Sequence, residues 1–310
     1  MKDRKEELFR YFFKEIEQKL EQFDSENTLP KADSSDVTKK DEPPVTNEKS
    51  SEVEDVDVVI IVAVPNEKDG VYSAFGLSRT LPRQFGLLNK YRFDYVQFEE
   101  AGLRIALLLQ PSMGMTQSSS LTTRAILGLN PKLVAMVGIC AGRKEKTQLG
   151  DIVIASNVFD YTAGKHYIDR FGPRPRSYPI DDSLAGYIGA SVIDNHELIG
   201  RIVDGYQGDK PDHSISIQFK PLASGTAVID DPQIIDEIAK TQDDLVGIDM
   251  EAYALAVSSN ILRTKWIVVK TVQDFADGDK AQTEKGIRTF AAYSSAKLLQ
   301  QILGDLSNYL

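Results

Sequence analysis

The stretch VAMVGICAGRKEKTQLGDIVIASNVFDYTAGK, residues 134–165, decides the fold. It opens on an apolar run over residues 133–137, passes through a glycine-rich segment at 138–142 and returns as a second apolar run at 152–155. Both runs predict buried strands, with a turn after the first. Polar residues just past the carboxyl ends of buried strands are the usual builders of a site in an α/β sheet. The stretch therefore predicts an α/β domain with a functional site near this turn.

Apolar runs alternate with amphipathic segments on both sides of this stretch, from residue 57 onward. The alternation predicts one large three-layer α/β domain over residues 57–310. Two of its strands, joined across Gly102, should form a hairpin. The expected strands are residues 58–64, 93–99, 103–109, 133–137, 152–155, 245–248 and 266–271, and the expected helices are residues 67–77, 116–129, 251–262 and 282–303.

The region before residue 57 has a different character. Residues 1–23 place mostly aromatic apolar side chains at helical spacing, which predicts an amphipathic N-terminal helix. Residues 24–56 contain ten acidic and four basic side chains and no aromatic residue, which predicts a flexible acidic linker. A tethered amphipathic helix is expected to pair with another chain or a protein partner, or else to pack on its own domain.

Composition narrows the class of protein. The chain has 310 residues and a formal net charge of −10, and no apolar run approaches the length of a membrane span. The charged N-terminus does not resemble a signal peptide, so a cytoplasmic protein without membrane attachment is expected. One cysteine, Cys140, and three histidines disfavour disulfides and a zinc site, and we expect neither metal nor cofactor. The sequence does not interleave basic and aromatic residues in the way that is typical of nucleic-acid binding, so we do not expect a nucleic-acid partner.

Carboxylates follow several of the predicted strands. Each has an ordinary structural explanation as a first-turn helix residue, an N-cap or a turn residue. Carboxylates that converge on one sheet edge repel one another unless a ligand or a shared proton offsets the cost, so their convergence would indicate a site. The strand ends concerned are Pro65-Asn66-Glu67, Gly138–Gly142, Asp249-Met250-Glu251 and Gln273-Asp274.

Four ordered motifs carry a resemblance. They are AVPNE at 63–67, VGxxAG at 137–142 with LGD at 149–151, MEA at 250–252 and QDFAD at 273–277. Together they resemble the purine nucleoside phosphorylase/nucleosidase superfamily over about residues 57–305. Within it the chain is most similar to 5′-methylthioadenosine/S-adenosylhomocysteine nucleosidases and to nucleosidase effector domains of bacterial antiviral systems. The resemblance implies a three-layer α/β/α fold with a mixed central sheet, a homo-oligomer and cleavage of a purine N-glycosidic bond.

The resemblance also implies roles for individual residues. Asp274 would protonate the purine at N7, Glu67 would orient and activate the attacking water, and Glu251 would hold the ribose hydroxyls with Met250 packed on the sugar. Val228 stands where relatives carry an aromatic residue that stacks on the base, so stacking would be weaker or supplied elsewhere. Phe159, Phe275 and Phe290 are the candidates for it, although core packing is the simpler explanation of each. The remaining positions assigned to substrate binding are Gly138, Ile139, Ile229 and Gln273.

Water rather than phosphate is the expected nucleophile. Phosphorylases of this superfamily generally place an arginine and a serine where this chain has Met136 and Ile139, and neither side chain can donate to a phosphate. The turn at 114–116 could bind an anion through backbone N–H groups, although a glycine turn with an N-cap explains it equally well. Cys140 is expected to be a buried, unreactive thiol.

The basic segment 165–176 bears on the substrate. Arg170, Arg174 and Arg176 could clamp the phosphates of a nucleotide, although a solvated loop is the simpler interpretation. Residues 57–310 carry a net charge of only −4, so an anionic ligand is acceptable there. We therefore expect hydrolysis of ATP or dATP to adenine, and the resemblance implies an antiviral setting for it. Methylthioadenosine cleavage and a catalytically silent nucleotide-binding module are the alternatives.

Overall fold

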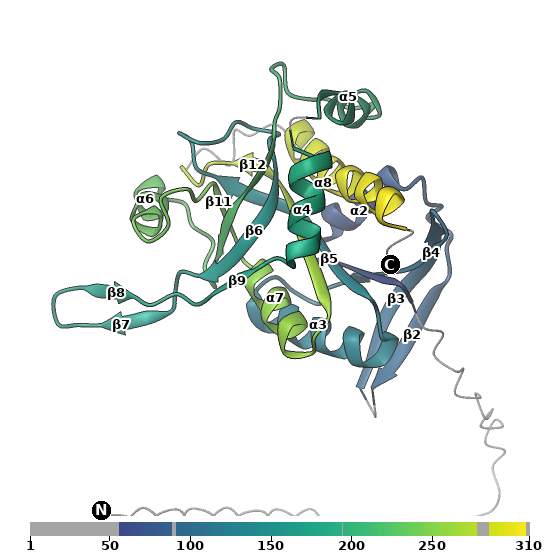
Figure 1. Cartoon of the computed structure of the whole chain (residues 1–310), viewed down its shortest axis with the longest axis horizontal. Helices are drawn as coiled ribbons and strands as arrows, with labels where there is room; N and C mark the ends of the chain where they lie inside the picture. Colours follow the sequence, from purple (N-terminus) through teal and green to yellow (C-terminus); the bar gives the residue numbers. More distant parts are fainter. Residues whose placement is uncertain (1–55, 89–90, 194, 278–284, 308–310) are drawn as a thin grey trace, which may run out of the picture. The chain divides into compact units, whose positions relative to one another are not determined.

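The computed structural model describes residues 56–88, 91–193, 195–277 and 285–307 (Figure 1). The helix predicted over residues 1–23 and nearly all of the predicted linker lie outside the described residues. Within the described part of the chain, no helix is long and apolar enough to cross a bilayer.

The centre of the sheet is apolar and parallel. β1 (Val58–Val62) lies between β4 (Leu103–Leu109) and β5 (Leu133–Gly142), and β5 pairs on its other side with β12 (Lys265–Asp274). All five residues of β1 are buried, as expected for a strand covered on both faces. These strands and the hairpin of β3 (Tyr91–Glu100) with β4 confirm the predicted pattern.

The sheet is mixed, with antiparallel pairs on both sides of this parallel centre: β3 with β4 on one side and β12 with β6 on the other. Its order is β11-β10-β6-β12-β5-β1-β4-β3-β2, and β11 also pairs antiparallel with the end of β5. Strands β5, β12, β6, β10 and β11 therefore form a closed ring of hydrogen-bonded neighbours, called the strand ring below. The bounds of the remaining strands are Arg83–Leu88 for β2, Ile152–Asp160 for β6, Ile217–Ser224 for β10 and Gly247–Asp249 for β11.

Helices cover both faces of the sheet, in accord with the three-layer prediction (Figure 1). α2 (Pro65–Ala74) packs on α8 (Lys285–Leu306), and α3 (Met115–Leu129) packs on α7 (Ala252–Ile261). The two strands β7 (Gly164–His166) and β8 (Phe171–Pro173) form a separate hairpin that extends away from the sheet. The other elements are β9 (Ser177–Pro179), α4 (Asp182–Ser191), α5 (His196–Asp204) and α6 (Pro232–Ala239).

The glycine-rich segment 138–142 is part of β5 rather than the turn predicted from sequence. Glycine is required there by close approaches and not by chain reversal. A Cβ on Gly138 would lie 1.9 Å from Oε1 of Glu67, and one on Gly142 would lie 2.4 Å from Oγ1 of Thr147. The strand therefore continues to the sheet edge while leaving room for neighbouring side chains.

Gly70 sets the distance between α2 and α8. A Cβ on Gly70 would lie 2.4 Å from the carbonyl oxygen of Ala292. We expect Gly70→Ala to push the helices apart and cost about 1–3 kcal/mol, which lowers Tm by about 2–12 °C in calorimetry. Gly186→Ala on α4 is the matched control, because no atom of the described residues outside its own stretch of helix lies within 4 Å of its Cβ position. Equal Tm values for the two variants would contradict this account of the packing.

Candidate active site

The strand ring brings the ends of several strands to one place. Ala141 on β5 pairs with Ile248 on β11 and with Asp274 on β12, and Ser224 on β10 pairs with Asp249. The register shifts between Val272 and Asp274, and such bulges commonly re-aim a side chain beside a site. The carboxylates that follow these strands consequently share one edge of the sheet.

A cavity of about 280 Å³ opens at this edge. Four carboxylates line it, so the convergence expected from the sequence is present. The cavity also contains residues that the sequence analysis did not select, namely Met113, Ala227 and Arg288. The predicted site residues that line it are Glu67, Ile139, Val228, Ile229, Met250, Glu251, Gln273 and Asp274.

Glu67 is held rigidly in the first turn of α2. Its Oε2 accepts hydrogen bonds from the backbone N–H groups of Ala63 (2.7 Å) and Val64 (3.2 Å), and its Oε1 accepts one from Ile139 (3.0 Å). The side chain is 2% exposed. Because Gly138 lacks a Cβ, Oε1 can approach the backbone of β5 directly. The carboxylate therefore has a fixed orientation at the cavity wall.

Lys270 is a fully buried cation behind this wall. Its Nζ lies 3.5 Å from Oδ2 of Asp249, 3.8 Å from Oε1 of Glu67 and 4.0 Å from Oε2 of Glu251. Burial disfavours the charged amine, but the three carboxylates outweigh it and raise the pKa of Lys270 above its usual value. Nζ makes no hydrogen bond within the described part of the chain. The sequence analysis missed this residue, although a lysine inside the run WIVVKTV was a signal.

Glu251 precedes α7 and faces both the cavity and the turn before α3. Its Oε1 accepts a hydrogen bond from the N–H of Gly114 at 2.8 Å. Burial raises the pKa of Glu251 to about 7, with Asp249 and Glu67 acting in the same direction and Lys270 and Gly114 in the opposite one. A carboxyl with this pKa changes charge near neutral pH.

Asp249 lines the cavity, but both of its carboxylate oxygens accept hydrogen bonds that hold structural elements together. Its Oδ1 accepts a hydrogen bond from Oγ of Ser224 at 2.6 Å, and its Oδ2 accepts one from the N–H of Ala252 at 3.0 Å. The carboxylate thus ties β10 to the start of α7. The N-cap of α7 is nevertheless Glu251 and not Asp249, so the N-cap explanation offered from the sequence is wrong in its residue.

Asp274 ends β12 and is 5% exposed. Its Oδ1 accepts a hydrogen bond from the N–H of Ala276, and its Oδ2 accepts one from Nε2 of Gln273, both at 2.9 Å. Gln273 thus orients the carboxyl group. The cavity is therefore lined by carboxyl groups from different elements: Asp274 ends β12, Glu67 lies in the first turn of α2 and Glu251 is the N-cap of α7.

The remaining predicted residues lie elsewhere. Phe159 is 2% exposed and packs in a small core cluster with Ala223 and Ile235, rather than on the cavity. Arg170 lines a different cavity, between the β7–β8 hairpin and α6. Arg174 follows that hairpin and donates to the hydroxyl of Tyr167 at 3.4 Å, and Arg176 lies between β8 and β9. None of the three arginines lines the carboxylate cavity.

Cys140 borders the cavity but is a poor nucleophile. Its side chain is buried, and burial raises the pKa of the thiol above its usual value. The thiolate that would attack a substrate is therefore scarce at neutral pH. This fits the expectation of an unreactive thiol.

Comparisons with known sequences give two informative relatives. The chain is 34% identical over 205 residues to the uncharacterised protein y4jS of Sinorhizobium fredii, which covers 64% of this chain and 49% of that protein. It is 25% identical over 248 residues to the ATP nucleosidase Cap17 of Escherichia coli, which covers 76% of this chain and 49% of Cap17. The chain thus spans about half the length of these relatives.

Solved structures share the fold. The 5′-methylthioadenosine/S-adenosylhomocysteine nucleosidase of Neisseria meningitidis, in complex with methylthio-immucillin-A, matches with a TM-score of 0.61 and 19% identity over 81% of this chain and 99% of that one. The corresponding nucleosidase of Colwellia psychrerythraea, in complex with adenine, matches with a TM-score of 0.63 and 17% identity over 82% and 97%. The sequence model of the phosphorylase superfamily matches residues 57–306, and this chain belongs to that superfamily.

Proposed function

We propose that the chain is an N-glycosyl hydrolase that releases adenine from an adenine nucleoside or nucleotide, with ATP or dATP as the favoured substrate. The observation that carries the proposal is the single cavity lined by Glu67, Glu251 and Asp274, which come from separate parts of the chain. Its relatives named as nucleosidases, including the ATP nucleosidase Cap17, support the same reaction class.

The reaction needs three kinds of help. As the C1′–N9 bond breaks, negative charge develops on the purine and positive charge on the ribose. Asp274 donates its proton to N7, so that the bonding electrons leave with a neutral base. Glu251 accepts hydrogen bonds from the ribose hydroxyls. The carboxylates of Glu67 and Glu251 stabilise the cationic sugar.

Water completes the reaction. Glu67 accepts a proton from the water as its oxygen bonds to C1′, which gives free adenine and the ribose product. Phosphate is a poorer fit as nucleophile, because Met136 is fully buried and the N–H of Ile139 already donates to Glu67. The fixed carboxylate of Glu67 supports a hydrolytic rather than a phosphorolytic reaction.

Methylthioadenosine or S-adenosylhomocysteine is the second candidate substrate. Val64 and Met113 supply apolar lining to the cavity, which suits a thioether substituent at the 5′ carbon. Further parts of the proposal come from the sequence and the family resemblance. These are a homo-oligomer, a protein partner for the N-terminal helix and a role as effector in antiviral defence.

A substrate panel tests the proposal. Purified full-length protein is incubated without phosphate with adenosine, methylthioadenosine, S-adenosylhomocysteine, AMP, ATP and dATP, and adenine is measured by chromatography. Adenine release from ATP at least as efficient as from methylthioadenosine supports the favoured substrate. Release from methylthioadenosine alone would replace it with the second candidate. Nucleotide binding without any adenine release would identify a silent binding module.

The pH dependence tests the role of Glu251. At pH values below its pKa of about 7, the side chain of Glu251 is protonated and accepts fewer hydrogen bonds from the ribose hydroxyls. We expect kcat/KM for adenosine to fall as pH drops from about 8 to 6, with a limb near 7. Glu251→Gln should raise KM, lower kcat and remove this limb.

The matched control is Glu197→Gln, which neutralises an exposed carboxylate on α5. It should keep the wild-type pH profile. If the limb persists in Glu251→Gln, another group is responsible for it and Glu251 does not bind the sugar in the way proposed.

A further inference from the structure

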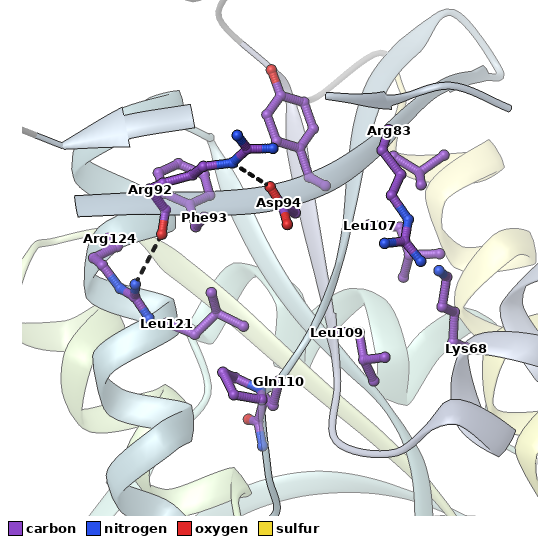
Figure 2. Close-up of a pocket in the computed structure, with 13 residues that line it drawn as sticks. Lys68, Arg83, Arg92, Phe93, Asp94, Leu107, Leu109, Gln110, Leu121 and Arg124 are labelled. Atoms are coloured by element: carbon purple, nitrogen blue, oxygen red, sulfur yellow. Dashed lines mark hydrogen bonds and ion pairs between the residues drawn. The ribbon is translucent and has the colours of Figure 1, made fainter. Parts of the chain in front are cut away.

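A second cavity, of about 430 Å³, lies among α2, α3 and the strands β2 to β4 (Figure 2). Lys68 and Arg83 enter it from one side, and Arg124 enters from the opposite side on α3 (Figure 2). Arg92 and Asp94 on β3 also line it. Four cationic side chains thus meet a single carboxylate.

Most of this positive charge has no internal counterion. Arg92 Nε pairs with Oδ1 of Asp94 at 2.9 Å. Lys68, Arg83 and Arg124 form no ion pair within the described residues. Like charges gathered in a concave site raise the local potential and attract anions. The cavity therefore has the electrostatics of an anion site.

The guanidinium of Arg124 is also held in place. Its Nε donates to the carbonyl of Ser120 at 3.2 Å and its Nη1 to the carbonyl of Arg92 at 3.3 Å. Lys68 Nζ lies 5.5 Å from the centre of the Tyr72 ring. A restrained guanidinium loses less freedom on binding, and its planar donors match phosphate oxygens.

Gln110 adds an unpartnered polar group to the cavity lining. It is 3% exposed, and its Nε2 donates to the carbonyl of Ser112 at 3.4 Å. Its Oε1 is buried and has no hydrogen-bond partner among the residues that the structure describes. Gln110 is thus a polar, uncharged member of the cavity lining beside the four cations.

Two chain segments connect this cavity to the carboxylate cavity. Lys68 directly follows Glu67 in α2. Gln110 lies four residues before Gly114, whose N–H donates to Glu251, so their Cα atoms are at most about 14 Å apart. Met113, between them, lines the carboxylate cavity. Residues that line the two cavities are therefore close neighbours along both segments, with Met113 next to the turn that joins them.

We propose that the basic cavity binds the phosphate groups of a nucleotide whose adenine and ribose occupy the carboxylate cavity. This inference rests on the proposed function and gives its substrate class. The phosphates leave the ribose at C5′ and run past Met113 toward Arg83 and Arg124. The positive lining selects nucleotides over uncharged nucleosides and thioethers.

The test compares ATP with adenosine, which has no phosphate. Arg83→Gln, Arg124→Gln and the double variant are assayed for adenine release from both substrates. We expect the ratio of kcat/KM for ATP to that for adenosine to fall about 10- to 100-fold for each arginine removed. Arg79→Gln is the control, because Arg79 is exposed, pairs with Asp69 and does not line the cavity. It should keep the wild-type ratio.

Binding of inorganic tripolyphosphate, followed by calorimetry, separates this inference from the proposed function. Binding to the wild type that is lost in the double variant supports the anion site even if no substrate is hydrolysed, in which case the proposed function alone fails. An unchanged ATP/adenosine ratio in the double variant, with adenine still released, overturns the inference and leaves the proposed function intact.

The hairpin arginines provide the competing site. If the triple variant Arg170→Ala, Arg174→Ala and Arg176→Ala lowers the ATP/adenosine ratio while the double variant does not, the phosphates bind at the hairpin and the inference is wrong. Salt gives a measurement on the unmodified chain. KM for ATP should rise with ionic strength and KM for adenosine should not, whereas equal salt responses would contradict a charged subsite.

Discussion

Asp274→Asn is expected to lower kcat for adenine release by at least about 100-fold, because an amide cannot donate the proton that makes adenine a neutral leaving group. The asparagine keeps the shape of the side chain, and its Oδ1 can still accept the hydrogen bond from Ala276. Folding should therefore change little. The measurement is single-turnover adenine release, with Tm recorded in parallel.

Two comparisons make this result specific. Asp236→Asn changes a half-exposed carboxylate on α6 in the same way and should retain full activity. The loss in Asp274→Asn should be smaller for a substrate analogue whose leaving group needs no protonation, such as a nitrophenyl riboside. A near-wild-type rate of adenine release from Asp274→Asn would exclude this residue as the acid.

Lys270→Met should have the largest effect on stability. The substitution keeps the size of the side chain but leaves Glu67, Asp249 and Glu251 buried without their cation. Breaking a buried ion pair typically costs about 3–5 kcal/mol, which corresponds to a loss of about 6–20 °C in Tm for a domain of this size. Activity should fall as well, since Glu67 and Glu251 would shift or take up protons.

The same substitution on the same strand supplies the control. Lys265 begins β12 and pairs with Asp181 at the surface, where an ion pair contributes at most about 1 kcal/mol. Lys265→Met should therefore leave Tm nearly unchanged.

Acid should reduce the defect of Lys270→Met. Carboxyl pKa values that rise in the folded variant favour folding at low pH, and this contribution is lost as pH rises through them. The Tm difference from wild type should accordingly be smaller at pH 5 than at pH 8. A Tm loss as small as that of Lys265→Met would show that Lys270 does not hold the cluster together.

The sequence predicted the elements whose local signal agrees with their environment. β1 and β12 are continuous apolar runs, and α3 has a clear helical period, so both kinds of element were found. β10 was missed because Lys220 and Pro221 interrupt it where the register shifts against β6. α4 was missed because two glycines lower its helix propensity.

The site residues could likewise be predicted only where the local sequence carries a signal. Glu67, Glu251 and Asp274 were found because carboxylates after buried strands stand out in a linear sequence. Lys270 was missed because its meaning depends on three carboxylates from distant parts of the chain. The basic cavity was missed for the same reason, since its cations come from separate helices and strands, whereas the arginines at 170–176 were conspicuous only because they are close in sequence.

The strand ring has a consequence for hydrogen exchange. Ala141 lies on β5 between Asp274 of β12 and Ile248 of β11, so its backbone is released only when a strand of the ring separates. Its exchange rate should report global unfolding, while amides in the β7–β8 hairpin should exchange by local fraying. The catalytic groups would then remain in place throughout the lifetime of the folded chain. Substrate entry and product release would depend on segments outside the ring.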